Sequence, residues 1–213
     1  MTAVAVYPSV WRWETPDPED DWMTADHFVA TASGVVLVDP PVVPGILATL
    51  AEWGPILGVV LTTHDHVRGA EWFQKTSGAP VHLPRPAWED PVRRGRLSAT
   101  PYGDGDPLPG GLAAHRIRVS TAMWDDEASA YVDEMALTTP DGGALLTGDV
   151  AMGGPAGQLW PCPEGLVSKP DPSKVAASRA AFQALLAQHP AVHTLLASHG
   201  HDVLGSLREA ALT

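Results

Sequence analysis

The stretch LTTHDHVRGAEWF, Leu61 to Phe73, decides the predicted fold of this chain. An apolar strand end and two threonines lead into His64 and His66, which stand one residue apart. Imidazoles at this spacing after a strand are typical of a metal-binding loop. The segment continues as Val67-Arg68-Gly69, where a site for two metals needs a carboxylate and a further imidazole. Because an isolated His-x-His pair is more often part of a hydrogen-bonded turn, the rest of the chain must decide its role.

Short predicted elements surround this stretch, because 21 prolines and 20 glycines divide the chain. Residues 27–38 predict a β-hairpin that turns at 32–34. Apolar periodicity predicts helices at 43–53 and 69–75, and Gly78 is predicted to stop the second of them. A longer amphipathic helix is predicted to be capped by Ser173 and to end at His189. The N-terminal arm around Trp11 and Trp13 and the segment 84–111 are predicted as loops. Further strands are predicted at 58–61, 80–83, 112–119, 134–139, 144–147 and 192–197.

This order of hairpins, helices and strands predicts an α/β (α+β) fold. Two packed sheets with helices on both outer faces satisfy it, which is a four-layer αββα sandwich. The length of 213 residues suits one domain that spans 1–213. Five residues each follow a predicted strand: Asp39, His64, His66, Asp149 and His199. Since ligands gather at the rim of a sheet, these side chains predict one common site.

Five segments, in their order and spacing, resemble the metallo-β-lactamase superfamily, in the branch of glyoxalase-II-like hydrolases. They are VVLVDPP, LTTHDHVRGAEWF, LPGG, TTPDGGALLTGD and LLASHG. The resemblance extends from about His27 to the C-terminus and implies the αββα sandwich. It also implies a hydrolytic site with two metal ions, generally zinc, bound by a His-x-His-x-Asp-His motif, a histidine from a later loop, a bridging aspartate and a final histidine. Such metals make hydroxide available at neutral pH.

The resemblance assigns four residues to metal-binding positions. His64 and His66 match the first two histidines of the motif, Asp149 matches the bridging aspartate, and His199 matches the final histidine. Asp39 is expected to bond backbone amides or to orient one of the histidines from behind.

The other three positions depart from the pattern. The aspartate of the motif falls on Arg68 and its second histidine on Gly69, while the later-loop histidine falls on Ala130 or near Met123. No histidine lies between His115 and His189. At 4 Å and an effective dielectric constant of 20, two unit charges repel by about 4 kcal/mol, and a dication beside a guanidinium by about double. Because guanidinium stays charged, we expect Arg68 to exclude the second metal and to pair with Asp149.

Three functions remain open on this basis. The first is an incomplete metal centre, metal-poor or metal-free, in a catalytically weak or silent pocket that binds a small molecule. The alternative is a mononuclear hydrolase of a small ester, thioester or lactone. It would use at most one divalent metal, with zinc as first choice, bound among His64, His66, Asp149 and His199. The third is metal-free hydrolysis, with His199 or His66 as general base and Arg68 holding an oxyanion. Whether the protein is an enzyme is left open by the sequence.

Composition limits the partners. The formal net charge of −12 repels nucleic-acid phosphate and anionic membranes, so neither is an expected partner. The single cysteine, Cys162, allows no intrachain disulfide, and its loop setting predicts an ordinary rather than a catalytic thiol. The N-terminus has no signal-peptide pattern, and no apolar run approaches the length of a membrane span. These features predict a cytoplasmic protein that acts on a small molecule.

Overall fold

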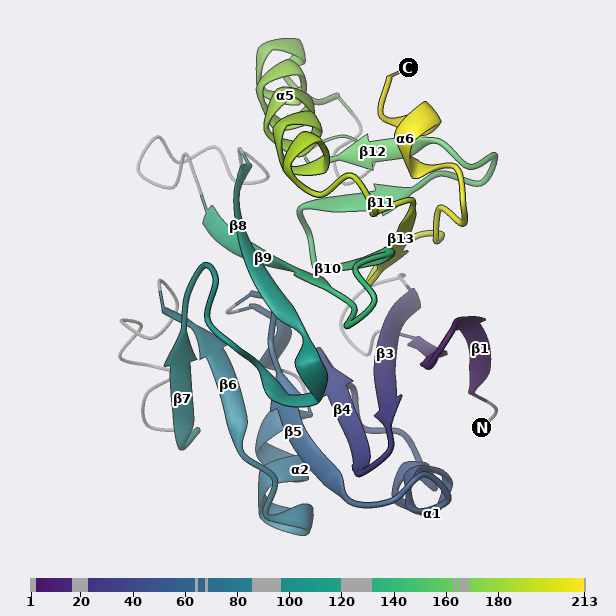
Figure 1. The fold of residues 1–213 in the computed structure, drawn as a ribbon, viewed down its shortest axis with the longest axis vertical. Coiled ribbons are helices and arrows are strands. Elements are labelled where there is room, and N and C mark those ends of the chain that lie inside the picture. Colours follow the sequence, from purple (N-terminus) through teal and green to yellow (C-terminus); the bar gives the residue numbers. More distant parts are fainter. Residues whose placement is uncertain are drawn as a thin grey trace.

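Two β-sheets lie face to face and carry helices on their outer faces in the computed structural model (Figure 1). It describes residues 3–16, 23–63, 65–67, 69–85, 97–119, 132–162, 164 and 169–212. The first sheet runs in the order β1 (Val4–Tyr7), β2 (Val10–Pro16), β3 (Met23–Thr31), β4 (Gly34–Val38), β5 (Ile56–Val60), β6 (Val81–Pro84) and β7 (Ala99–Tyr102). The second runs in the order β13 (Thr194–Ala197), β10 (Ala144–Thr147), β9 (Val132–Thr138) and β8 (Ala113–Val119).

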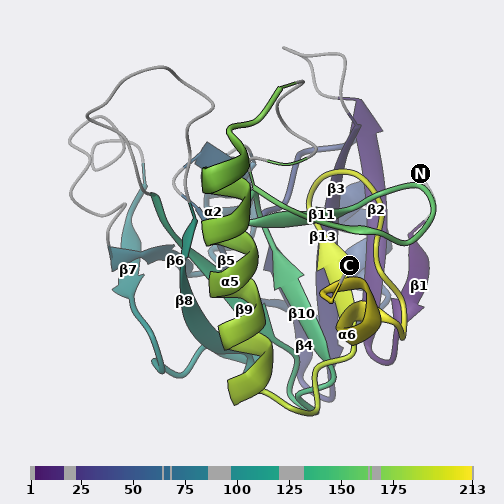
Figure 2. The same cartoon turned by 90° about the horizontal axis from the view of Figure 1, so that it is seen from above.

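Helices and a small hairpin complete the layers. The first sheet is covered by α1 (Ile46–Ala51) and α2 (Ala70–Ser77), and the second by α5 (Pro172–Gln188) and α6 (Leu207–Ala210) (Figures 1 and 2). The hairpin pairs β11 (Ala151–Gly153) with β12 (Leu159–Pro161) beside the second sheet. Single 3-10 turns are η1 (Asp65–Val67) and η2 (Pro109–Gly111). In the described part of the chain, no helix is long and apolar enough to cross a bilayer.

Side-chain alternation along the strands builds the layers. In β4, Val35 and Leu37 pack against the helices, whereas Val36 and Val38 pack toward the second sheet, as the two-residue period of a strand requires. A third core cluster, which includes Phe182 of α5, lies between the second sheet and its helices. Three apolar layers between four structural layers confirm the αββα sandwich.

The N-terminal arm is not the predicted loop but forms β1 and β2. Strand β2 pairs with β3 along its whole length, from Val10 opposite Val29 to Pro16 opposite Met23. Trp13 is 1% exposed, and the Trp11 ring stacks on Phe28 at 5.3 Å between centroids. Valine and tryptophan favour a strand, and in Trp11-Arg12-Trp13-Glu14 tryptophan alternates with charged residues, a pattern that the prediction as a loop overlooked.

Two further predictions need correction. The segment 84–111 contains β7, an edge strand that pairs in parallel with β6 and tolerates Pro101 at the edge. Helix α5 is capped by Asp171 rather than by Ser173, because the Asp171 carboxylate accepts the Ser173 backbone N–H at 2.8 Å. The predicted turn at 32–34 and the helix stop at Gly78, whose φ is 73°, are confirmed.

Candidate metal centre

The carboxyl ends of four strands meet at one rim of the two sheets. Strands β4 and β5 run parallel in the first sheet, as do β10 and β13 in the second. Their ends carry Asp39, the loop to His66, Asp149 and His199, respectively. The backbone N–H of Met135 in β9 donates to the carbonyl of Thr62 at 3.0 Å, which joins the second sheet to this loop. The rim therefore brings together residues that lie far apart in the sequence.

Asp39 is the buried anchor of the site. Its backbone adopts a φ of 50°, unusual for a residue with a side chain, and its carboxylate is fully buried. One oxygen accepts the Thr62 backbone N–H at 2.8 Å, and the other accepts the Thr62 hydroxyl at 2.6 Å and the Ser198 hydroxyl at 3.3 Å. The second oxygen also lies 3.1 Å from His66 Nδ1. The predicted contacts of Asp39 with a backbone amide and a motif histidine are thus confirmed.

The other ring nitrogen of His66, Nε2, lies close to Asp149 and His199. His66 Nε2 lies 3.2 Å from Asp149 Oδ1, His199 Nε2 lies 3.1 Å from the same oxygen, and the two Nε2 atoms are 3.3 Å apart. Zinc bonds of about 2.0–2.1 Å in a tetrahedron separate neighbouring ligand atoms by about 3.3 Å. The three atoms thus have the spacing of one face of such a tetrahedron. The donor set of two imidazoles and a carboxylate fits a divalent cation and leaves a further position for water or substrate.

The ionisable groups of the site shift one another's pKa values. Burial alone lowers the pKa of His66, but Asp149 and Asp39, one against each ring nitrogen, raise it to about 10. Burial raises the pKa of Asp149, yet His66 and His199 bring it well below its usual value. Burial likewise opposes ionisation of Asp39, and His66 and Thr62 outweigh it, so the pKa of Asp39 is lowered. A divalent cation bound by His66 Nε2 would therefore have to displace a proton from this nitrogen.

Glu134 lies beneath the site and was missed by sequence reasoning. It is 2% exposed, and its carboxyl oxygen accepts the backbone N–H of Asp149 at 3.1 Å. Burial, followed by the charge of Asp149, raises the pKa of Glu134 well above its usual value. The signal available in the sequence was weak, because the strand VDEMALT holds two adjacent acidic residues and the sequence does not show that one of them, Glu134, is buried.

Cys162 is buried nearby and behaves as an ordinary thiol. Burial, helped by the charges of Glu134 and Asp149, raises its pKa to about 12. A thiol with so high a pKa is a poor nucleophile at neutral pH. This agrees with the prediction of a non-catalytic cysteine.

Two glycines allow the close packing around the histidines. A Cβ atom at Gly148 would lie 2.4 Å from the Thr62 hydroxyl and 3.3 Å from the His66 ring. A Cβ atom at Gly69 would lie 2.6 Å from the Pro40 carbonyl oxygen and 2.8 Å from Val42. Position 69 is where the resemblance expects the second histidine of the motif. The Pro40–Val42 segment fills the space that this side chain would need.

Several predicted site residues lie outside the described part of the chain. These are His64, Arg68, and the loop that holds Met123 and Ala130. The pairing of Arg68 with Asp149 therefore stays a prediction. Among the described residues, the structure brings together His66, Asp149 and His199 from the predicted ligand set.

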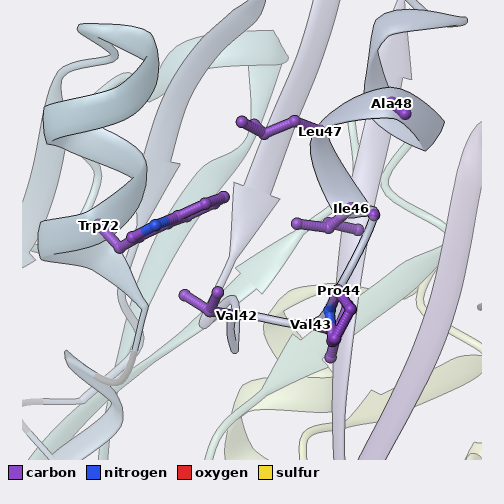
Figure 3. Close-up of a pocket in the computed structure, with 8 residues that line it drawn as sticks. Val42, Val43, Pro44, Ile46, Leu47, Ala48 and Trp72 are labelled. Carbon is purple, nitrogen blue, oxygen red and sulfur yellow. The ribbon is translucent and has the colours of Figure 1, made fainter.

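An apolar hollow lies on the helical side of the first sheet, away from the histidine cluster. It has a volume of about 420 Å³ and opens between the segment before α1 and Trp72 of α2 (Figure 3). Its lining is apolar and consists of Val42, Val43, Pro44, Gly45, Ile46, Leu47, Ala48 and Trp72. Among the described residues, no titratable side chain lines it, so it offers no acid, base or metal ligand.

Comparison with known proteins supports the fold. No family model and no curated protein matches this sequence. The DIM-1 metallo-β-lactamase structure is 12% identical with a TM-score of 0.71, and the alignment covers 99% of this chain and 95% of that one. A metallo-β-lactamase from Pontibacter korlensis is 15% identical with a TM-score of 0.68, covering 100% and 99%.

The FIM-1 metallo-β-lactamase from Pseudomonas aeruginosa, solved in its mono-zinc form, is 16% identical with a TM-score of 0.69, covering 99% and 92%. At such identities the likeness establishes the fold, and this chain has the metallo-β-lactamase fold. The expected glyoxalase-II-like branch is not distinguished by these neighbours and stays a prediction.

Proposed function

We propose that this protein is a hydrolase of small esters, thioesters or lactones that uses one divalent cation, with zinc as the first choice. The cation would be held by His66, Asp149 and His199. The observation that carries the proposal is the triangle of 3.1, 3.2 and 3.3 Å between their three ligand atoms. The substrate class follows from the resemblance to glyoxalase-II-like hydrolases and from the acidic chain, whose formal net charge is −12.

Each residue of the rim has a definable task. A bound divalent cation would supply Lewis acidity and lower the pKa of water to about 7. Asp39 accepts the Nδ1 proton of His66, which leaves Nε2 as the nitrogen that faces the cation site. Asp149 supplies the negative charge that partly balances a dication. Glu134 holds the backbone of Asp149 and thereby the direction of its carboxylate.

A single cation is more consistent with the chain than a pair. The imidazole expected at position 69 is absent, and the Pro40–Val42 segment closes the space beside Gly69. The aspartate expected at position 68 is an arginine. Both changes remove ligands of the second metal that the resemblance implies, whereas His66, Asp149 and His199 still offer three ligand atoms to a single cation.

One observation favours a second candidate, a catalytically silent pocket that binds a small molecule without metal. The raised pKa of His66, about 10, means that its imidazolium can neutralise Asp39 and Asp149 without a metal ion. The two candidates differ in whether zinc displaces that proton at neutral pH. The measurement of metal content therefore separates them.

The test is metal content per chain by mass spectrometry, on protein purified without chelator and again after zinc addition and desalting. We expect about one zinc per chain, lost in His199→Ala and in Asp149→Asn. The matched control is His193→Ala, an exposed histidine on the approach to β13. Retention of zinc would justify an ester, thioester and lactone screen with the same variants. If the wild-type chain retains no zinc after loading, the silent pocket is the better description.

A further inference from the structure

The turn that carries His199 is held from several sides. It follows β13 and begins with Ser198, whose carbonyl accepts the Ala25 backbone N–H at 2.8 Å. After His199, the backbones of His201 and Gly153 exchange two hydrogen bonds of 2.8 and 3.0 Å. These bonds fix the backbone on both sides of the turn. The position of the His199 ring therefore depends on the backbone conformation of residues 199–201.

The guanidinium of Arg12 in β2 binds two residues that follow His199 in this turn. Its Nη2 donates to the Gly200 carbonyl at 2.9 Å, and its Nη1 donates to Asp202 Oδ1 at 2.6 Å. The same Asp202 oxygen accepts the backbone N–H of Ala197 at 3.0 Å. One planar group thus ties together residues on both sides of His199.

Arg12 and Asp202 form a buried ion pair, with side chains that are 10% and 8% exposed. Arg12 also donates from Nε and Nη2 to Glu14, but the side chain of Glu14 is 49% exposed, so solvent weakens this ion pair. His27 lies 3.8 Å from Asp202, but burial and the charge of Arg12 lower its pKa to about 3, so it is neutral. Arg12 is therefore the cation that balances Asp202 inside the protein. A buried pair of this kind is costly to break on one side.

We propose that Arg12 is a positioning residue for His199: its contacts with Gly200 and Asp202 hold the His199 turn at the distance that the cation site requires. The inference rests on the proposed function. It gives a role to strand β2, which lies outside all five motif segments. A planar fork that serves a carbonyl and a carboxylate at once cannot be replaced by a lysine ammonium.

The test compares Arg12→Lys with Arg208→Lys. Arg208 also donates to two backbone carbonyls, those of Leu186 and His189, but at the C-terminal end of α5. Zinc affinity is measured by competition with a chelator, and the free energy of unfolding of the metal-free proteins by urea. The side-chain ¹⁵N resonances of His199 are followed in the metal-free proteins, with those of His193 as internal reference. Asp202→Asn is the second variant: its amide oxygen can still accept the N–H groups of Ala197 and Arg12, so this change removes the negative charge that holds the Arg12 guanidinium.

We expect zinc affinity to fall by about tenfold to a hundredfold in Arg12→Lys, as for other groups that orient a ligand from behind. The His199 resonances should shift in Arg12→Lys and Asp202→Asn but not in Arg208→Lys. Unchanged zinc affinity and unchanged His199 resonances in both variants would overturn the positioning role. Loss of affinity in proportion to a global loss of stability, equal to that in Arg208→Lys, would also overturn it. If the wild-type chain binds no zinc while His199 still shifts in Arg12→Lys, the proposed function fails and the positioning role stands.

Discussion

At the scale of single residues, Asp39 holds His66, one of the three residues proposed to bind the cation. It satisfies the Thr62 backbone N–H and hydroxyl and orients His66 through Nδ1. We predict that Asp39→Asn lowers zinc affinity by about tenfold to a hundredfold, because an amide is a weaker partner for the His66 ring. Competition titration against a chelator measures this. Asp106→Asn, which alters an exposed ion pair with Arg85, is the control and should leave the affinity unchanged.

Gly69 gives a second prediction at this scale, which concerns whether an alanine there stabilises or destabilises the folded chain. Its φ of −88° and ψ of −3° suit any residue, and glycine-to-alanine changes at such positions usually stabilise a chain. Here the added Cβ would meet the Pro40 carbonyl oxygen at 2.6 Å, so overpacking outweighs the gain. We predict that Gly69→Ala destabilises the protein by about 1–3 kcal/mol in urea unfolding. Gly103→Ala, whose Cβ would have only ordinary contacts from 3.5 Å, is the control, and equal stability of the two variants would contradict the steric reading.

At the scale of elements, the sequence predicted best those strands and helices whose apolar pattern is unbroken. The hairpin of β3 and β4 and the end of α2 at Gly78 needed only local signals. The arm of β1 and β2 was missed although its valines and tryptophans favour a strand, because the prolines and charged residues around it were read as a loop, and its pairing with β3 cannot be read from the sequence. The same limit hid Arg12 and Glu134, whose partners are distant in sequence. The cluster of His66, Asp149 and His199 could be predicted because these residues follow strands and match the order of a known motif, whereas Arg12 and Glu134 belong to no motif.

Helix α5 provides a test of the corrected cap. The side chain of Asp171 accepts the Ser173 backbone N–H, while the Ser173 hydroxyl only donates to that carboxylate. We predict that Asp171→Ala lowers the free energy of unfolding by about 1 kcal/mol and that Ser173→Ala lowers it by a few tenths. Urea denaturation of both variants checks the order. A larger loss in Ser173→Ala would restore the cap predicted from the sequence.

At the scale of the whole molecule, the site links stability to pH. The pKa of His66 is raised to about 10 in the folded chain, above its unfolded value near 6.5. Its contribution to the stability of the metal-free protein is therefore complete below about pH 6.5 and is lost as the pH rises through about 10. Asp39 and Asp149 have lowered pKa values, so their contribution is present above about pH 4 and lost on acidification.

Zinc binding should depend on pH in the opposite direction from the stability of the metal-free protein above pH 6.5, because metal and proton compete for His66 Nε2. We predict that the metal-free protein loses stability from pH 6.5 to 9 in urea unfolding, whereas zinc affinity rises over the same range. The rise should be about tenfold per pH unit if one proton leaves per zinc bound, measured by chelator competition at several pH values. His66→Gln removes the titrating group and should flatten both profiles. A zinc affinity that does not change with pH in the wild-type chain would mean that the cation does not use His66, and the three-ligand site would have to be abandoned.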